Sequence, residues 1–90
     1  MNQVHCAHIL VKTEAKAKEL LEKIKSGESF SKLAQEHSEC PSGKRGGDLG
    51  WFSRGMMVKP FEDEAFKLKK GELSGIVKTS FGHHLIKRLE

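Results

Sequence analysis

The sixteen residues from Gly46 to Phe61 constrain the fold of this chain more than any other segment. They contain four of the nine glycines, three of the six aromatic residues and two of the three methionines. So much glycine is unfavourable inside a helix, and so much apolar surface is unfavourable in a solvated loop. Residue types alone favour a glycine-interrupted strand that leads into a helix over an ordinary core. The alternative is the floor of a pocket for an apolar group, with Met and Phe as an adaptable wall.

Length and composition place the chain among small folded proteins. Ninety residues predict one domain spanning 1–90, and 37% hydrophobic with 31% charged residues argue against a disordered chain. No apolar run approaches the roughly 18 residues that cross a bilayer. The first residues lack the basic and apolar regions of a secretory signal, which predicts a cytoplasmic protein. Cys6 and Cys40 are too few for a disulfide framework, and we interpret both as free thiols.

The charge balance permits several partners and requires none. The formal net charge is +4, which favours weak contact with nucleic acid or with an anionic membrane. Acidic residues are interspersed among the basic ones, so neither partner is obligatory. We expect a small domain of this kind to be a monomer.

The predicted elements follow the order strand, two helices, strand, helix and two strands, which is an α+β arrangement. Both alternating faces of residues 4–11 are apolar, which predicts a central strand covered on both sides. His5 and His8 fall on opposite faces of that strand. Thr13 and Ser29 are typical helix N-caps. The predicted segments after the first strand are helices from Thr13 to Gly27 and from Ser29 to Ser38, a basic loop at 40–47, a strand at 48–53, a helix from Pro60 to Gly71, and a hairpin with strands at 74–78 and 83–89.

Two histidines and a cysteine at the edges of these elements are the candidate chemical groups. His8 interrupts an apolar strand, His84 begins the last strand, and Cys40 follows a helix end. Functional side chains collect at such positions. An isolated histidine among apolar residues is nevertheless more often a hydrogen-bonded core residue. Residue types therefore leave both interpretations open.

Two other kinds of site are disfavoured by spacing. A zinc ion would need ligands from among His5, His8, His37, Cys40, His83 and His84. No Cys-x-x-Cys pair occurs, and the paired histidines of each strand point to opposite faces, so we expect no metal site. The loop at 42–47 lacks the leading glycine and the following helix of a phosphate-binding P-loop. A solvated basic loop is the simpler interpretation.

Several separated motifs occur together and in order. They are Gly46-Gly47-Asp48-Leu49-Gly50 with Phe52, Gly55-x-Met57 and Pro60-Phe61, flanked by His8 to Lys12, Ser42 to Gly47 and Thr79 to Ile86. Together they resemble the signature of parvulin-type peptidyl-prolyl cis/trans isomerases, and the similarity covers nearly the whole chain. It implies the parvulin-like fold, a four-stranded antiparallel sheet surrounded by about four helices. The fourth helix would be a short turn near residues 54–58.

The resemblance also implies a site, without metal or cofactor, for proline-containing peptides and for unfolded or partly folded proteins. The positions that match the family's proline pocket are Leu49, Met57 and Phe61, with Phe81 widening the apolar surface. The positions that match its reaction centre are His8, Cys40, Thr79 and His84.

We therefore predict a peptidyl-prolyl cis/trans isomerase that assists folding by a non-covalent twist of X-Pro bonds. Attack by the Cys40 thiolate is the rival mechanism, disfavoured because Asp fills the matching position in some relatives. No arginine follows Lys12, where the phosphate-specific branch carries an arginine-rich loop, so we expect an apolar or uncharged residue before the proline. Two alternatives stay open: a module that binds proline segments with little turnover, and a basic surface that contacts nucleic acid or membrane.

Overall fold

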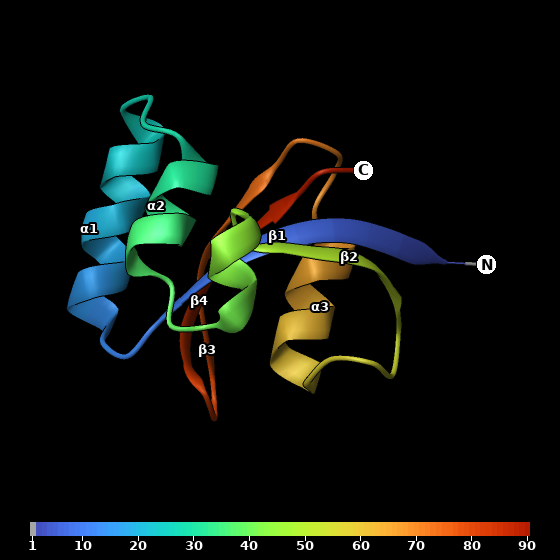
Figure 1. Cartoon of the computed structure of the whole chain (residues 1–90). Helices are drawn as coiled ribbons and strands as arrows, with labels where there is room; N and C mark the ends of the chain where they lie inside the picture. Colours follow the sequence, from blue (N-terminus) through green and yellow to red (C-terminus); the bar gives the residue numbers. More distant parts are fainter. Residues whose placement is uncertain (1) are drawn as a thin grey trace.

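The computed structural model describes residues 2–90, which form a four-stranded antiparallel sheet with helices on both faces (Figure 1). The strand order is β2-β1-β4-β3. The α+β class and the order of strands and helices predicted from the sequence are confirmed. In chain order the elements are β1 (Gln3–Val11), α1 (Glu14–Lys25), α2 (Phe30–His37), the 3-10 helix η1 (Pro41–Arg45), β2 (Asp48–Ser53), α3 (Lys59–Lys67), β3 (Leu73–Thr79) and β4 (Gly82–Arg88).

Strand β1 lies inside the sheet, between β2 and β4. Its two apolar faces bury against different helices, because successive side chains of a strand alternate between the faces. Ile9 points to the core shared with α1 and α2, and Cys6 to the core shared with α3, and both are fully buried. Figure 1 shows α1 and α2 together on one side of the sheet and α3 on the other. The expected central strand is thus present.

Both predicted N-caps form. The backbone N–H of Lys16 donates to Thr13 Oγ1 at 3.1 Å, and that of Lys32 donates to Ser29 Oγ at 3.2 Å. Each bond satisfies one of the donors that the first turn of a helix leaves without an intrahelical partner. No helix of the described chain has the length and apolar character to cross a membrane.

The third helix ends earlier than expected, at Lys67 rather than at Gly71. Leu68 already has an extended backbone, with ψ of 143°, and its side chain is buried in the core on the α3 side of the sheet. The guanidinium of Arg88 donates to the carbonyl oxygen of Leu68 at 2.6 Å. Burial of this side chain and the bond to β4 turn the chain away from the helix, so Gly71 serves the next turn, with φ of +87°.

The short additional helix also differs in place from the expectation. Residues 54–57 form turns and bends and no helix, whereas Pro41–Arg45, predicted as a loop, form η1. Pro41 presets the backbone of the first turn, and Gly46, with φ of +71°, ends the segment with its N–H directed to Gly43 and Ser42 carbonyl oxygens. A Cβ on Gly43 would lie 2.9 Å from the carbonyl oxygen of Ala34, so η1 packs directly on α2.

Candidate active site

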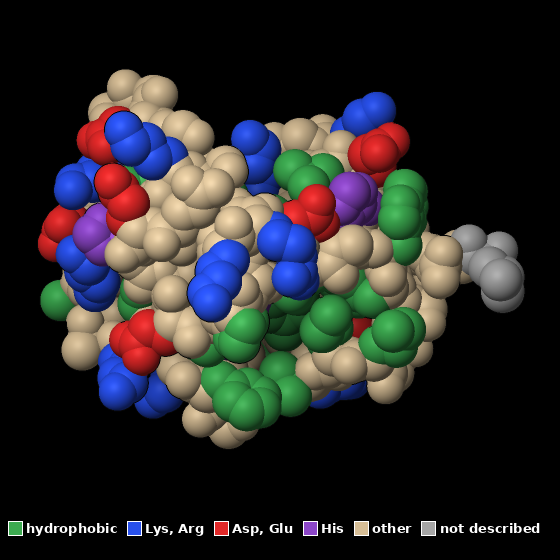
Figure 2. All heavy atoms as spheres, in the orientation of Figure 1, with side chains coloured by type: hydrophobic (Ala, Val, Ile, Leu, Met, Phe, Trp, Pro, Cys, Tyr) green, Lys and Arg blue, Asp and Glu red, His purple; other side chains and the backbone are tan. Residues whose placement is uncertain are grey.

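An apolar cavity of about 500 Å³ opens where η1, the sheet and the connection from β2 to α3 meet. Figure 2 shows hydrophobic side chains gathered around a hollow in the lower part of the face in view. The residues that line the cavity are His8, Leu10, Glu39, Cys40, Pro41, Leu49, Met56, Met57, Val58, Phe61, Phe81 and His84.

Three apolar residues from different elements reach the cavity from the core on the α3 side. Phe61, in the first turn of α3, is buried, and Leu49 of β2 and Met57 of the connection are partly buried against the same core. The ring of Phe61 meets the rings of His8 and His84 edge-on, with centroids 5.4 and 5.2 Å apart. The apolar wall and the imidazoles are therefore in direct contact.

Gly47 brings the start of β2 against this wall. Its φ is +84°, and a Cβ at this position would collide with the carbonyl oxygen of His8. Its own carbonyl oxygen accepts the N–H of His8 at 2.9 Å. Glycine is required here for both the positive φ and the close backbone approach.

The two histidines form a buried pair. Their Nδ1 atoms lie 3.0 Å apart, and their rings stack with centroids 5.2 Å apart. On the other side, His84 Nε2 lies 2.7 Å from Thr79 Oγ1, which in turn accepts the N–H of Phe81 at 3.1 Å. Because Thr79 is at the end of β3 and Phe81 in the hairpin turn, this chain of bonds ties the imidazoles to the hairpin.

Both imidazoles are neutral at physiological pH. Burial, reinforced by the neighbouring His84, lowers the pKa of His8 to about 4. Burial, reinforced by His83, lowers the pKa of His84 to about 4 as well. Two neutral rings that share an Nδ1–Nδ1 contact need one donor and one acceptor. We assign the proton to Nδ1 of His8, because its buried Nε2 has no hydrogen-bond partner among the described protein groups. His84 then accepts at Nδ1 and donates from Nε2 to Thr79.

Cys40 lies at the rim of the same cavity. It is half-buried at the N-terminus of η1, and its Sγ accepts a hydrogen bond from Ser42 Oγ at 3.2 Å. The second thiol, Cys6, is buried within β1, and burial raises its pKa to about 11. Of the two free thiols, Cys40 alone is placed to meet a molecule in the cavity.

The structure brings the sequence-predicted site residues together. All of them line the cavity except Thr79, which contacts His84 from the buried side. Sequence reasoning missed the lining residues Leu10, Glu39, Pro41, Met56 and Val58. Met56 and Val58 lie within the conspicuous segment, so their place beside Met57 offered a signal. Glu39 offered none, because a glutamate next to a loop is ordinarily solvated.

The candidate metal ligands named from the sequence do not come together at one point. His5 lies on the opposite face of β1 from His8, where its Nε2 is 2.7 Å from Asp48 Oδ1. No group of three or more potential metal ligands occurs among residues 2–90.

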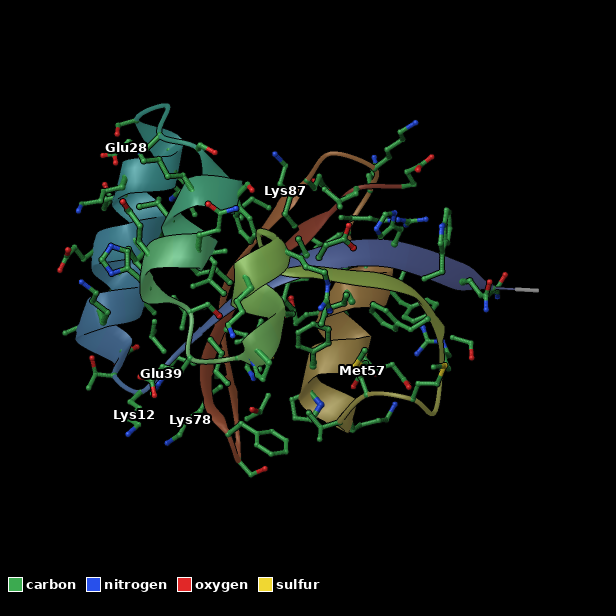
Figure 3. The ribbon with its side chains drawn as sticks, in the orientation of Figure 1. Lys12, Glu28, Glu39, Met57, Lys78 and Lys87 are labelled. Atoms are coloured by element: carbon green, nitrogen blue, oxygen red, sulfur yellow. The ribbon has the colours of Figure 1, made fainter. Side chains whose placement is uncertain are left out.

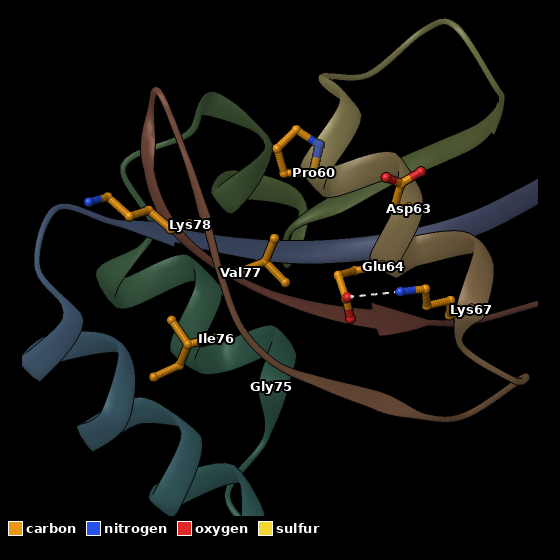
Figure 4. A pocket seen from close by; sticks show the side chains of 8 residues that line it. All are labelled: Pro60, Asp63, Glu64, Lys67, Gly75, Ile76, Val77 and Lys78. Carbon is orange, nitrogen blue, oxygen red and sulfur yellow. Dashed lines mark ion pairs between the residues drawn. The ribbon is translucent and has the colours of Figure 1, made fainter.

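A second depression, of about 390 Å³, lies between α3 and the edge strand β3 (Figure 4). Its charged groups are Asp63, Glu64, Lys67 and Lys78. Figure 4 marks the ion pair between Glu64 and Lys67, whose charged atoms are 3.7 Å apart. It shares no residue with the apolar cavity and contains none of the predicted site residues.

The comparisons with known proteins agree on one kind of domain. The family model described as PPIC-type PPIASE domain matches residues 1–90. The chain is 56% identical over 86 residues to the foldase protein PrsA of Geobacillus kaustophilus, covering 94% of this chain and 31% of that protein. It is 63% identical over 60 residues to peptidyl-prolyl cis-trans isomerase Pin1 of Digitalis lanata, covering 67% of this chain and 51% of the relative.

A solved structure of similar size extends the likeness to the whole fold. The solution structure of NmPin, the parvulin of Nitrosopumilus maritimus, superposes with a TM-score of 0.89 at 53% identity, covering 100% of this chain and 98% of that one. The foldase relatives are longer: this chain spans about a third of their length.

Proposed function

The chain belongs to the family of PPIC-type peptidyl-prolyl isomerase domains, and on that premise we propose that it accelerates cis/trans rotation of X-Pro bonds without covalent chemistry. The observation that carries the proposal is the contact of an apolar wall with a neutral, hydrogen-bonded imidazole pair inside one cavity. Its substrates would be unphosphorylated proline-containing segments of unfolded or partly folded proteins. The monomeric state and the cytoplasmic location stay sequence predictions.

The apolar wall suits a pyrrolidine ring. Leu49, Met57 and Phe61 offer carbon and sulfur surfaces and no formal charge. Burial of a proline ring against them is favourable because it removes apolar area from water. The ring would then be held while the preceding carbonyl turns, which is the motion that isomerisation requires.

The rotational barrier of the X-Pro bond determines how much the site must lower the activation free energy. Rotation about a peptide bond costs about 18–20 kcal/mol because the amide loses its resonance, and uncatalysed prolyl isomerisation takes roughly tens to hundreds of seconds. A reduction of roughly 6–7 kcal/mol shortens this time to about milliseconds, at about 1.4 kcal/mol per tenfold. No bond breaks, so the enzyme must favour the twisted amide over both planar forms.

The polar residues have distinct proposed roles. His8, His84 and Thr79 form a neutral scaffold that holds the cavity in shape through bonds of 3.0 and 2.7 Å. Cys40 would lie near the rotating carbonyl and adjust its electrostatic surroundings. A low-dielectric cavity favours the twisted amide, because it is less dipolar than the planar one.

Stopped-flow isomerisation of Ala-Pro and Leu-Pro peptides tests the proposal. We expect acceleration by the wild type and a loss of at least tenfold in kcat/KM for Met57→Ala, since the substitution removes part of the ring's contact surface. Trp51→Ala is the matched control, because Trp51 is exposed in the adjacent strand but does not line the cavity. Binding of the peptides without any acceleration would instead identify a module that holds proline segments.

A further inference from the structure

One lining residue of the apolar cavity does not fit a purely apolar substrate. Of the described residues around the cavity, Glu39 alone carries a formal charge at neutral pH, because both imidazoles are neutral. It lies in the short connection between α2 and η1. Its backbone is fixed to the sheet, since its N–H donates to the carbonyl oxygen of Leu10 at 2.8 Å. The backbone that carries this carboxylate is thus held beside the cavity.

The ion pair that Glu39 makes with Lys12 is weak. Lys12 Nζ lies 3.7 Å from Glu39 Oε1, and the two side chains are 81% and 45% exposed. Figure 3 shows the two side chains next to each other, with Met57 on the far side of η1. Ion pairs between exposed groups contribute little, so a second cation can join or replace Lys12 at small cost. Glu39 therefore remains available to a bound peptide.

The residues around Glu39 indicate which part of a bound peptide would lie next to it. Cys40, the next residue, is the group proposed to lie near the rotating carbonyl, and that carbonyl belongs to the residue before the proline. Met57 of the proline wall lines the same cavity from the other side of η1 (Figure 3). A peptide with its proline ring on this wall and its carbonyl at Cys40 would have the residue before the proline on the side of the cavity that Glu39 lines.

We propose that Glu39 is a specificity-determining residue that selects lysine or arginine immediately before the proline and disfavours aspartate, glutamate and phosphorylated residues there. This inference rests on the isomerase function proposed above. It departs from the expectation of an apolar or uncharged residue at that position. The long stems of Lys and Arg suit apolar walls, while their charged ends reach a carboxylate. The same carboxylate repels an acidic side chain.

The test is a series of Ala-Xaa-Pro-Phe peptides in which Xaa is Lys, Ala, Glu or phosphoserine, measured as ratios of kcat/KM for one protein. An exposed ion pair is worth up to about 1 kcal/mol, which corresponds to about fivefold. We expect a Lys-to-Ala ratio of roughly two to five and an Ala-to-Glu ratio of similar size. Both ratios should shrink toward one as NaCl is raised, because salt screens exposed charges.

Two substitutions separate charge from shape. In Glu39→Gln both ratios should fall to about one, and in Glu39→Lys the order should invert, with Glu-Pro turned over faster than Lys-Pro. Lys12→Gln should raise the Lys-to-Ala ratio, because it removes the competing ammonium. Glu36→Gln is the matched control: this exposed carboxylate on α2 lies outside the cavity, and its ratios should equal those of the wild type.

The outcomes distinguish this inference from the proposed function. A wild type that accelerates Ala-Pro peptides but shows equal rates for Lys, Ala and Glu overturns the role of Glu39 and leaves the isomerase intact. Two further results overturn it. In one, Glu39→Lys still turns over Lys-Pro faster than Glu-Pro. In the other, Glu36→Gln changes the ratios as much as Glu39→Gln does. A lack of acceleration on every peptide overturns the isomerase itself. Peptides with Lys after the proline serve as the positional control and should show no dependence on Glu39.

Discussion

Removal of the Glu62 carboxylate should loosen the connection that carries Met57 to the cavity. Glu62 lies in the first turn of α3 with a side chain only 8% exposed. One carboxylate oxygen accepts the N–H of Gly55 at 2.6 Å, and the other accepts Arg54 Nη1 at 3.1 Å. The Arg54 guanidinium in turn lies over the ring of Phe66, 4.4 Å from its centroid. Glu62 therefore fastens the turn between β2 and α3 to the helix.

The size of the effect follows from these contacts. A hydrogen bond to a charged group contributes roughly 1.5–3 kcal/mol. Arg54 and Gly55 are both exposed to water, which compensates part of the loss. We expect Glu62→Ala to lower the free energy of unfolding by about 3 kcal/mol, or roughly 12–24 °C in Tm for a domain of this length. Glu62→Gln should cost about half as much, because the amide oxygen still accepts the Gly55 N–H.

Urea denaturation and isomerase kinetics measure the two consequences. KM should rise in Glu62→Ala more than kcat falls, because the loosened connection weakens the hold on the proline ring. Asp63→Asn is the control: this neighbouring carboxylate also pairs with Arg54 and Lys59 but is exposed, so we expect less than about 0.5 kcal/mol. A loss below 1 kcal/mol in Glu62→Ala, or one equal to that of Asp63→Asn, would refute the reasoning.

Three further predictions concern the imidazole pair, the thiol and the glycine beside them. The pKa values of His8 and His84 are lowered from 6.5 to about 4 in the folded state, so the unfolded chain binds protons first as the pH falls. The free energy of unfolding should therefore decrease from about pH 6.5 toward about pH 4, by at most about 1.4 kcal/mol per pH unit for each histidine. Urea titrations of the wild type and of His84→Leu should differ in this slope, and equal slopes would contradict the assignment. Cys40→Asp should keep isomerase activity within about tenfold in kcat/KM; total loss with the fold intact by circular dichroism would support a nucleophilic thiolate instead. Gly47→Ala should lower the free energy of unfolding by at least about 2 kcal/mol, because φ is +84° and the added methyl group meets the His8 carbonyl; thermal denaturation within 2 °C of the wild type would contradict this.

Local sequence signals determined much of the architecture. The two apolar faces of residues 4–11 indicated a strand covered on both sides, because a strand with one solvated face would expose half of these apolar side chains. Thr13 and Ser29 specified the starts of α1 and α2 through bonds that form within three residues. Such features depend on near neighbours in the chain and can be inferred without the rest of the molecule. The motif between Gly46 and Phe61 carried the family resemblance, which the match over residues 1–90 confirms.

Contacts between distant segments decided what the sequence alone did not. The packing of Gly43 against Ala34 made a 3-10 helix of a segment expected to be a loop. The burial of Leu68 ended α3 before Gly71.

The chemistry of the cavity depends on the same kind of contact. His8 and His84 are 76 positions apart, and their neutral state follows from burial that no local pattern reveals. Glutamate is a residue type typical of the surface. Glu39 becomes the charged group of an apolar cavity only because η1 and the connection before α3 meet beside it. The physical reason is common to both: burial and electrostatic environment are properties of the folded whole, whereas strand pattern and helix capping are properties of neighbours in the chain.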